Sequence, residues 1–238
     1  MKLEKVTLEG AARSARRYED ACGAAHALDL VGERWALLVI REMMFGPRRF
    51  GELRTSLPGI SANVLTQKLE ALEAAGVVAR RRLPPPASVQ VYDLTDWGRE
   101  LHPVFGMLGM WAARSPRHDP TLPLSAISMM MSFQTMFRAE RAKGIDLTLN
   151  FNFGDDRFRG TVRDGRFEVE RGVAEEADAI VTGQPPALAG LVYGGVPLAA
   201  LQAEGLLDLQ GDPDVLARFA GLFELPPKVA GPPVRAAG

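Results

Sequence analysis

The 238-residue sequence has few of the residues that build disulfide frameworks and metal sites, with one cysteine, Cys22, and three histidines. A single cysteine excludes an intramolecular disulfide, and no histidine or cysteine cluster has metal-ligand spacing. The charged start, Met1–Lys5, precedes no apolar signal core, and no apolar run approaches the roughly 20 residues that span a bilayer. We expect a cytoplasmic protein without membrane association, bound metal or other cofactor.

The sequence also lacks the short motifs of common enzymes, namely the nucleophile elbow, the phosphate-binding loop and the dinucleotide fingerprint. Two carboxylate pairs, Asp155–Asp156 and Glu175–Glu176, fall at expected turns with no histidine beside them. We expect these pairs to be solvated turn charges rather than acid–base groups. The chain is therefore expected to bind its partners and not to catalyse a reaction.

Charge is distributed unevenly along a composition that is otherwise typical of globular proteins, 47% hydrophobic and 24% charged. Residues 1–118 hold 17 Lys and Arg against 13 Asp and Glu, whereas residues 119–238 hold 11 against 16. A basic and an acidic module with different partners are indicated. With a proline-rich linker between them, the predicted division is an N-terminal arm (1–17), a first module (18–115), the linker (116–123), a second module (124–224) and a flexible proline-rich tail (225–238).

The first module has the pattern of a helix-turn-helix followed by a hairpin. Helices are predicted over 19–31, 33–45 and 50–57, and Ser61 can cap a further helix that ends at Gly76. Strands predicted over 77–83 and 89–94 flank Pro84–Ser88. A hairpin directly after a helix-turn-helix is typical of a wing, although a basic edge strand protected by its charge has the same pattern.

A winged helix-turn-helix places its second helix in the major groove of double-stranded DNA. The polar residues of that helix are then candidates for reading bases: Ser61, Asn63, Val64, Gln67 and Lys68. Arginines beside the first helix and on the wing are candidates for phosphate contacts: Arg48, Arg49, Arg54, Arg80, Arg81 and Arg82. The alternative for the helix is an ordinary solvated polar face.

An apolar stripe runs along a helix predicted over 96–113, which Thr95 can cap and Pro103 can kink. Its members recur at helical spacing: Trp97, Leu101, Val104, Leu108 and Trp111. A small winged domain has little core left to cover this stripe, so we expect a homodimer interface here, with intramolecular packing as the alternative.

The first module resembles the HxlR-type winged helix-turn-helix transcriptional regulators over residues 18–115. The ordered motifs that carry the resemblance are Leu30–Trp35, Arg49–Leu53, Pro58–Ser61, Leu65–Leu69, Tyr92–Thr95 and Gly98–Leu101. The resemblance implies a dimer that binds a roughly palindromic operator. In some members a cysteine near position 22 senses oxidants, and His26 lies four residues on. Cys22 is accordingly either a reactive thiol or a small buried packing residue.

The second module alternates strands with helices and resembles the sterol-carrier-protein-like fold over residues 120–224. Strand 145–153 alternates strictly, Asp164–Gly165 is a hairpin turn, and 205–212 leads into the last helix. The resemblance implies a mixed sheet with helices that enclose an apolar cavity for lipid-like ligands. Residues expected to line the cavity, or alternatively to fill a core, are Met129, Met130, Phe133, Met136, Phe137 and Phe151.

These inferences predict an α+β protein that joins a winged helix-turn-helix domain to a sterol-carrier-like α/β domain. Its predicted function is transcriptional regulation, by repression as the default, with an apolar small molecule as effector. One alternative is a regulator that senses thiol oxidation through Cys22. Another is a lipid carrier whose winged domain does not bind DNA.

Overall fold

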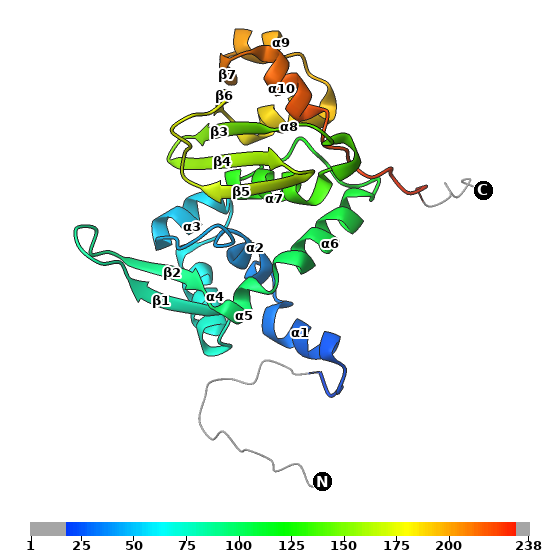
Figure 1. Cartoon of the computed structure of the whole chain (residues 1–238). Helices are drawn as coiled ribbons and strands as arrows, with labels where there is room; N and C mark the ends of the chain where they lie inside the picture. Colours follow the sequence, from blue (N-terminus) through cyan, green and yellow to red (C-terminus); the bar gives the residue numbers. More distant parts are fainter. Residues whose placement is uncertain (1–17, 232–238) are drawn as a thin grey trace.

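The computed structural model describes residues 18–231, which form a winged helical domain and a sheet domain (Figure 1). The predicted arm, residues 1–17, lies outside the described residues, as do residues 232–238 of the predicted tail. Both domains combine helices and strands, so the α+β class is confirmed. Within residues 18–231, no helix is both long enough and apolar enough to cross a bilayer.

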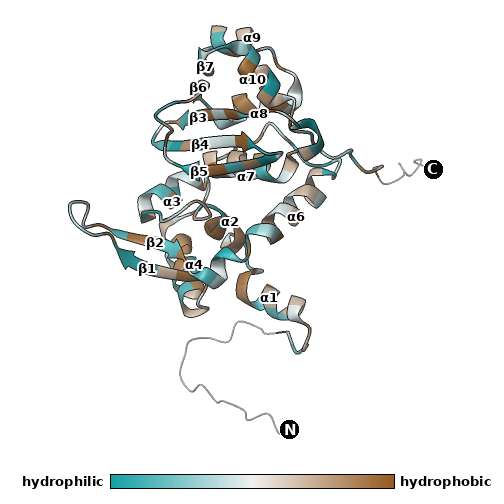
Figure 2. Ribbon diagram, viewed as in Figure 1, coloured by the Kyte–Doolittle hydropathy of each residue, from teal (hydrophilic) through white to brown (hydrophobic). Residues whose placement is uncertain are grey.

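The winged domain begins with α1 (Gly23–Val31), which has no buried residue. Its core is formed by α2 (Ala36–Arg41), α3 (Phe50–Ser56) and α4 (Ala62–Ala74), together with residues of the hairpin that follows. The Ser61 hydroxyl accepts the N–H of Val64 at 3.3 Å, which confirms Ser61 as the cap of α4. Helix α2 is shorter than the predicted 33–45, because Trp35 has a left-handed backbone with φ of 78° and turns replace helix after Arg41. Figure 2 shows hydrophobic residues concentrated on α2, which packs against α4.

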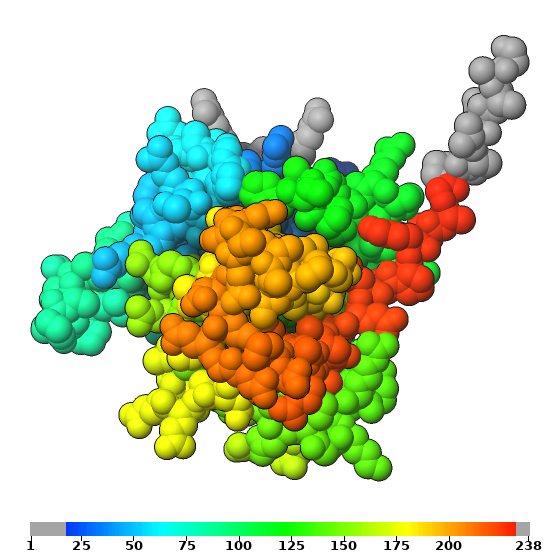
Figure 3. All heavy atoms as spheres, turned by 90° about the horizontal axis from the view of Figure 1, so that it is seen from above, coloured from blue at the N-terminus to red at the C-terminus, as the bar shows by residue number. Residues whose placement is uncertain are grey.

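The wing is the antiparallel hairpin of β1 (Val78–Arg82) and β2 (Gln90–Leu94). Arg48 forms an isolated antiparallel β-bridge with Tyr92 of β2. Its backbone N–H donates to the Tyr92 carbonyl, and its carbonyl accepts the Tyr92 N–H, each at 2.8 Å. Viewed from above, the wing projects from one side of the molecule (Figure 3).

The helix predicted over 96–113 is divided into α5 (Asp96–Arg99) and α6 (His102–Ala113). Thr95 caps α5 as predicted, its hydroxyl accepting the Gly98 N–H at 3.0 Å. The division has a local cause, since Pro103 has no N–H to bond to the carbonyl of Arg99. Helix α6 then runs from the winged domain to the sheet domain, where it packs against α7 (Ala126–Met136).

The sheet domain has one mixed sheet, in which the strand order is β5-β4-β3-β6-β7. Strands β3 and β6 pair in parallel and the other neighbours are antiparallel. The bounds are β3 (Leu147–Phe153), β4 (Asp156–Arg163), β5 (Arg166–Arg171), β6 (Ala179–Gly183) and β7 (Leu207–Gly211). The mixed sheet expected from the sequence is therefore present.

Helices cover one face of this sheet, and the apolar side chains of the strands point into that layer. Besides α7 the helices are the short 3-10 turn Ala139–Arg141, α8 (Pro185–Gly194), α9 (Leu198–Ala203) and α10 (Pro213–Ala220). Asp212 caps α10 by accepting the Asp214 N–H at 2.9 Å. The opposite face of the sheet carries the polar members of the alternating strands.

The described part of the predicted tail runs back to the end of α6. The Val229 N–H donates to the Arg114 carbonyl at 2.8 Å, and Lys228 Nζ donates to the Ser115 carbonyl at 3.0 Å. The last carbonyls of a helix have no partner within the helix. Residues of the tail supply donors to them, so this segment is bonded to the chain through at least Val229.

Candidate nucleic-acid interface

Helix α4, the second helix of the helix-turn-helix, presents polar side chains to solvent in its first two turns. Asn63 and Gln67 are exposed, and so is Ser61, although its hydroxyl is engaged in capping the helix. Thr66 is exposed as well and was not among the predicted residues; its three-residue spacing from Asn63 is the signal that places it there. Amide side chains at such positions suit the paired donor and acceptor of adenine.

Two of the five predicted base-reading residues make contacts within the winged domain. Val64 is half-buried and packs against the core of the winged domain. Lys68 is paired with Glu33 of the α1–α2 connection, and its side chain is only 16% exposed. The turn of the helix directs both side chains toward the rest of the domain, and base reading by these two residues stays a prediction.

The wing carries its three arginines on the outward part of β1, the hydrophilic end of the strand in Figure 2. Arg80 bonds to Glu73 of α4 at 3.1 Å and lies over the Tyr92 ring, and Arg81 pairs with Asp93 at 2.8 Å. Arg82 donates instead to the carbonyl of Ser88, so no carboxylate neutralises it within the described chain. All three side chains remain exposed to solvent.

The arginines beside α3 separate into two exposed residues and one buried residue. Arg49 and Arg54 face solvent, as a phosphate contact requires. Arg48 is buried, with a side chain only 7% exposed, and it forms an ion pair with Asp156 of the sheet domain. The predicted phosphate contact of Arg48 is therefore wrong, because its charge is used between the two domains.

Asp156 lies at the start of β4 and is the centre of a small charged cluster. It accepts hydrogen bonds from Arg48 and, at 2.7 Å, from Arg171, while Arg48 also donates to the Ser56 hydroxyl at 3.1 Å. Burial alone would raise the pKa of Asp156, but the hydrogen bonds and charges of the two arginines outweigh it and hold that pKa below its ordinary value. Asp156 is thus not the solvated turn charge that the sequence suggested.

Other contacts also join the two domains. Glu42 at the end of α2 is fully buried and accepts hydrogen bonds from Arg41 and from the Ser125 hydroxyl, the latter at 2.8 Å. The Phe45 ring meets the Phe158 ring edge-on at a centroid distance of 5.6 Å. Sequence reasoning missed this interface, since an alternating strand gives no sign of what covers its ends.

An exposed apolar surface lies on α1, α5 and α6. On α6, Trp111 is 76% exposed, Met107 is 65% exposed, and Leu108 is also exposed. Leu28 of α1 and Trp97 of α5 are exposed as well. Two members of the predicted stripe differ, because Leu101 packs against the core of the winged domain and Val104 is half-buried. The apolar surface that remains suits burial against another molecule.

Cys22 is exposed and immediately precedes α1. The backbone N–H groups of Ala24 and Ala25 lower the pKa of its thiol, as expected at the start of a helix. The buried packing role that was the alternative for Cys22 is therefore wrong for the described chain.

The six predicted ligand-lining residues of the sheet domain lie together between α7 and the sheet. Met129, Met130, Phe133 and Phe151 are fully buried, Met136 is nearly so, and Phe137 is half-buried. The ring of Phe133 contacts the rings of Phe151, Phe219 and Phe223 at centroid distances of 4.5–5.9 Å. These residues occupy a packed core, the alternative that the sequence left open.

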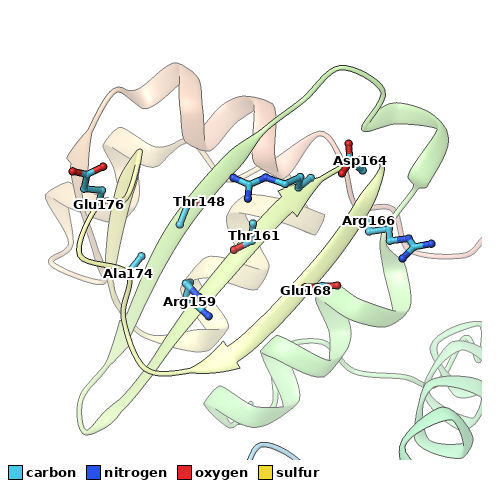
Figure 4. Close-up of a pocket in the computed structure, with 9 residues that line it drawn as sticks. Thr148, Arg159, Thr161, Asp164, Arg166, Glu168, Ala174 and Glu176 are labelled. Atoms are coloured by element: carbon cyan, nitrogen blue, oxygen red, sulfur yellow. The ribbon is translucent and has the colours of Figure 1, made fainter.

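A hollow of about 760 Å³ lies on the other, polar face of the sheet (Figure 4). Its lining side chains come from β3, β4, β5 and the connection that follows β5, and they include Thr148, Arg159, Thr161, Glu168 and Glu176. Arg159 is paired with Glu170 at 2.5 Å. The hollow has mixed charge and differs in chemistry from the expected apolar cavity.

Comparison with known proteins assigns different relatives to the two domains. The family model described as HxlR-like helix-turn-helix matches residues 30–119. The uncharacterized HTH-type transcriptional regulator YvaP of Bacillus subtilis is 37% identical over 86 residues, which are 36% of this chain and 80% of that protein. The HTH-type transcriptional regulator YodB of the same organism is 38% identical, over 36% of this chain and 77% of that protein.

The sheet domain matches a different family model from the winged domain. The family model described as alkyl sulfatase C-terminal matches residues 123–229. The solved structure of the sec-alkylsulfatase Pisa1 from Pseudomonas sp. is 25% identical over 42% of this chain and 16% of that chain, with a TM-score of 0.40. The matching family model does not identify the sheet domain as sterol-carrier-like.

Proposed function

Because the chain belongs to the HxlR-like helix-turn-helix family of transcriptional regulators, we propose that it binds double-stranded DNA as a homodimer. The observation that carries the proposal is the exposed pair Asn63 and Gln67 on α4, beside a wing with three exposed arginines. The operator is a roughly palindromic sequence whose half-sites lie about 10 bp apart, or a multiple of that spacing. A dimer that occupies a promoter represses transcription by default.

The test of base reading begins with selection of bound duplexes from a random pool at roughly physiological ionic strength. On the selected operator, Asn63→Ala and Gln67→Ala should each reduce discrimination against a changed base by about 1–3 kcal/mol. Competition between the selected duplex and single-base variants measures the effect. Equal weakening on all duplexes would contradict the assignment.

Arg82→Ala is the matched control for the phosphate contacts. It should weaken binding to the operator and to random DNA alike, and lower the slope of affinity against salt by about one. A loss confined to one base position would instead make Arg82 a base-reading residue.

The dimer is proposed to form through the exposed apolar residues of α1 and α6. Met107→Glu with Trp111→Lys should give a monomer in sedimentation experiments and abolish tight binding to the palindrome. Val173→Lys, at an apolar position of the sheet domain that is 49% exposed, should leave the dimer intact. A wild-type monomer that binds the palindrome would contradict this part of the proposal.

We propose further that the sheet domain is sterol-carrier-like and binds an apolar effector within the layer between α7 and the sheet. The support is the run Met129–Met131, since methionine side chains repack easily around a ligand. Fatty acid and sterol probes should raise the thermal midpoint and change operator affinity. Probe binding without any sequence-dependent DNA binding would favour the alternative of a lipid carrier.

A second candidate function is oxidant sensing through Cys22, favoured by the exposure and lowered pKa of its thiol. Diamide should then change operator affinity in the wild type and not in Cys22→Ser. An unchanged affinity, or the same response in both proteins, would remove this candidate.

A further inference from the structure

The charged cluster between the domains connects directly to the wing. We propose that Asp156 of the sheet domain is a positioning residue for DNA binding, which acts by holding Arg48 and thereby the wing and α3. The sheet domain is then a structural part of the DNA-binding unit and sets its affinity. This inference rests on the proposed DNA binding and assigns a role to a residue outside the winged domain.

Arg48 joins three parts of the molecule through separate groups. Its backbone pairs with Tyr92 of β2 in both directions, and its guanidinium donates to Ser56 at the end of α3 and to Asp156. A displacement of the carboxylate therefore acts on the wing and on the first helix of the helix-turn-helix together.

A second arginine fixes the carboxylate from the side of the sheet domain. Arg171 of β5 donates to Asp156 at 2.7 Å and to the Phe45 carbonyl at 3.2 Å, and its guanidinium lies over the Phe158 ring. Asp156 is therefore held from both domains, and its side chain is only 18% exposed. Removal of the carboxylate would leave buried Arg48 with only the exposed carboxylate of Glu52, 3.9 Å away, as counter-charge, an unfavourable arrangement.

The cluster also borders the core in which the effector is proposed to bind. Phe158 lies opposite Phe151 in the β3–β4 register and meets Phe45 of the winged domain. A rearrangement around Phe151 would shift β4, which carries Asp156 at its first position. From Phe158 the contacts run through Arg171, which lies over its ring and bonds to Asp156, and then through Arg48 to Tyr92 of the wing.

The test compares Asp156→Asn and Arg48→Met with two matched controls on the selected operator. Both variants should weaken binding by between about twofold and thirtyfold without changing the salt slope, because neither residue contacts a phosphate. The double variant should be no weaker than the more affected single variant. Asp156→Glu keeps the charge and should recover part of the affinity.

The controls separate positioning from general electrostatics. Asp146 of the same domain forms an exposed ion pair with Arg163 at 3.2 Å. Asp146→Asn removes this pair and should bind the operator as the wild type does. Arg49→Met changes the exposed neighbour of Arg48 and should lower the salt slope by about one. Wild-type affinity in Asp156→Asn, or a lowered slope in Arg48→Met, would overturn the inference.

Hydrogen exchange without DNA tests the coupling independently of the proposed function. Asp156→Asn should speed exchange at the amides of Arg48 and Tyr92, while the amides of Leu65 and Leu69 in α4 keep their protection. Unchanged exchange at Arg48 and Tyr92 would overturn the coupling. Faster exchange in a protein that binds no DNA would retain the coupling and reject the proposed function.

Discussion

At the scale of single residues, one buried asparagine supports the connection between β5 and β6. The Asn150 amide donates to the Ala174 carbonyl at 2.9 Å and accepts the Ala174 N–H at 2.8 Å, so it replaces a strand partner for this segment. Asn150→Leu leaves both backbone groups without partners. We expect the free energy of unfolding to fall by about 1–3 kcal/mol in urea titration.

Asn152→Leu is the control, since Asn152 lies on the same strand and face. Its side chain makes one long hydrogen bond, donating to the Thr182 hydroxyl at 3.3 Å. Asn152→Leu should cost less than Asn150→Leu. Equal losses of unfolding free energy would mean that both substitutions destabilise β3 itself and not the connection between β5 and β6.

The sequence predicts which residues of a strand share a face, and it does not predict what covers that face. Strict alternation over 145–153 placed Asn150 and Asn152 together, and both lie opposite the apolar core. The partners of Arg48 and Asp156 could not be predicted in this way, because 108 residues separate the two side chains. An exposed arginine beside a helix-turn-helix and a buried one have the same local sequence signal.

At the scale of elements, α5 approaches the start of the wing closely through a glycine. A Cβ added at Gly98 would lie 2.2 Å from the Val77 carbonyl oxygen. Gly98→Ala should therefore force α5 away from β1 and lower stability by about 1–3 kcal/mol in thermal unfolding.

Gly51→Ala in α3 is the matched control, because a Cβ there meets nothing within 4 Å. Alanine in a helix is favoured over glycine by about 0.5–1 kcal/mol, so this variant should be neutral or more stable. Equal destabilisation by both substitutions would contradict the close contact.

Local signals predicted elements where the chain itself provides the hydrogen bonds. Ser61, Thr95 and Asp212 each cap the predicted helix, and Asp164–Gly165 makes the predicted turn with positive φ at both residues. The predictions were wrong where packing decides, as in the left-handed backbone of Trp35 and the early end of α2.

At the scale of the whole molecule, acid should loosen the contact between the domains. The pKa of Asp156 is lower in the folded protein than its ordinary value of 3.8. Its ionised form therefore contributes stability above about pH 4, and this contribution is lost as the pH falls through the folded pKa. The difference in unfolding free energy between wild type and Asp156→Asn should be constant near neutral pH and shrink below pH 4.

Urea titrations between pH 3 and pH 7 measure this difference. Asp146→Asn provides the comparison, since its carboxylate forms an exposed ion pair with Arg163, at the opposite end of the β3–β4 pair from Asp156. A difference that grows toward low pH would contradict the assignment to Asp156.

The contact between the two domains could not be predicted from the sequence. A proline-rich stretch over 116–123 and the change of pattern across it predicted two modules with a linker between them. In the structure α6 packs against α7, and His102 bonds to Gln134 at 2.9 Å. The composition of the linker predicts only the conformation of the linker itself. It does not predict which side chains of the two domains contact each other.

The tail returns to α6, so the last described part of the chain stabilises a helix that lies more than 100 residues before it. Residues 227–229, which follow the whole sheet domain, bond to the end of the helix that precedes it. A chain cut only within 116–123 would thus yield two fragments that stay together, held by the tail at one end and by Arg48 and Asp156 at the other. A chain that stopped at residue 115 would lose both the hydrogen bonds from the tail and the ion pair of Arg48 with Asp156. Its winged domain would therefore be less stable than that of the intact protein.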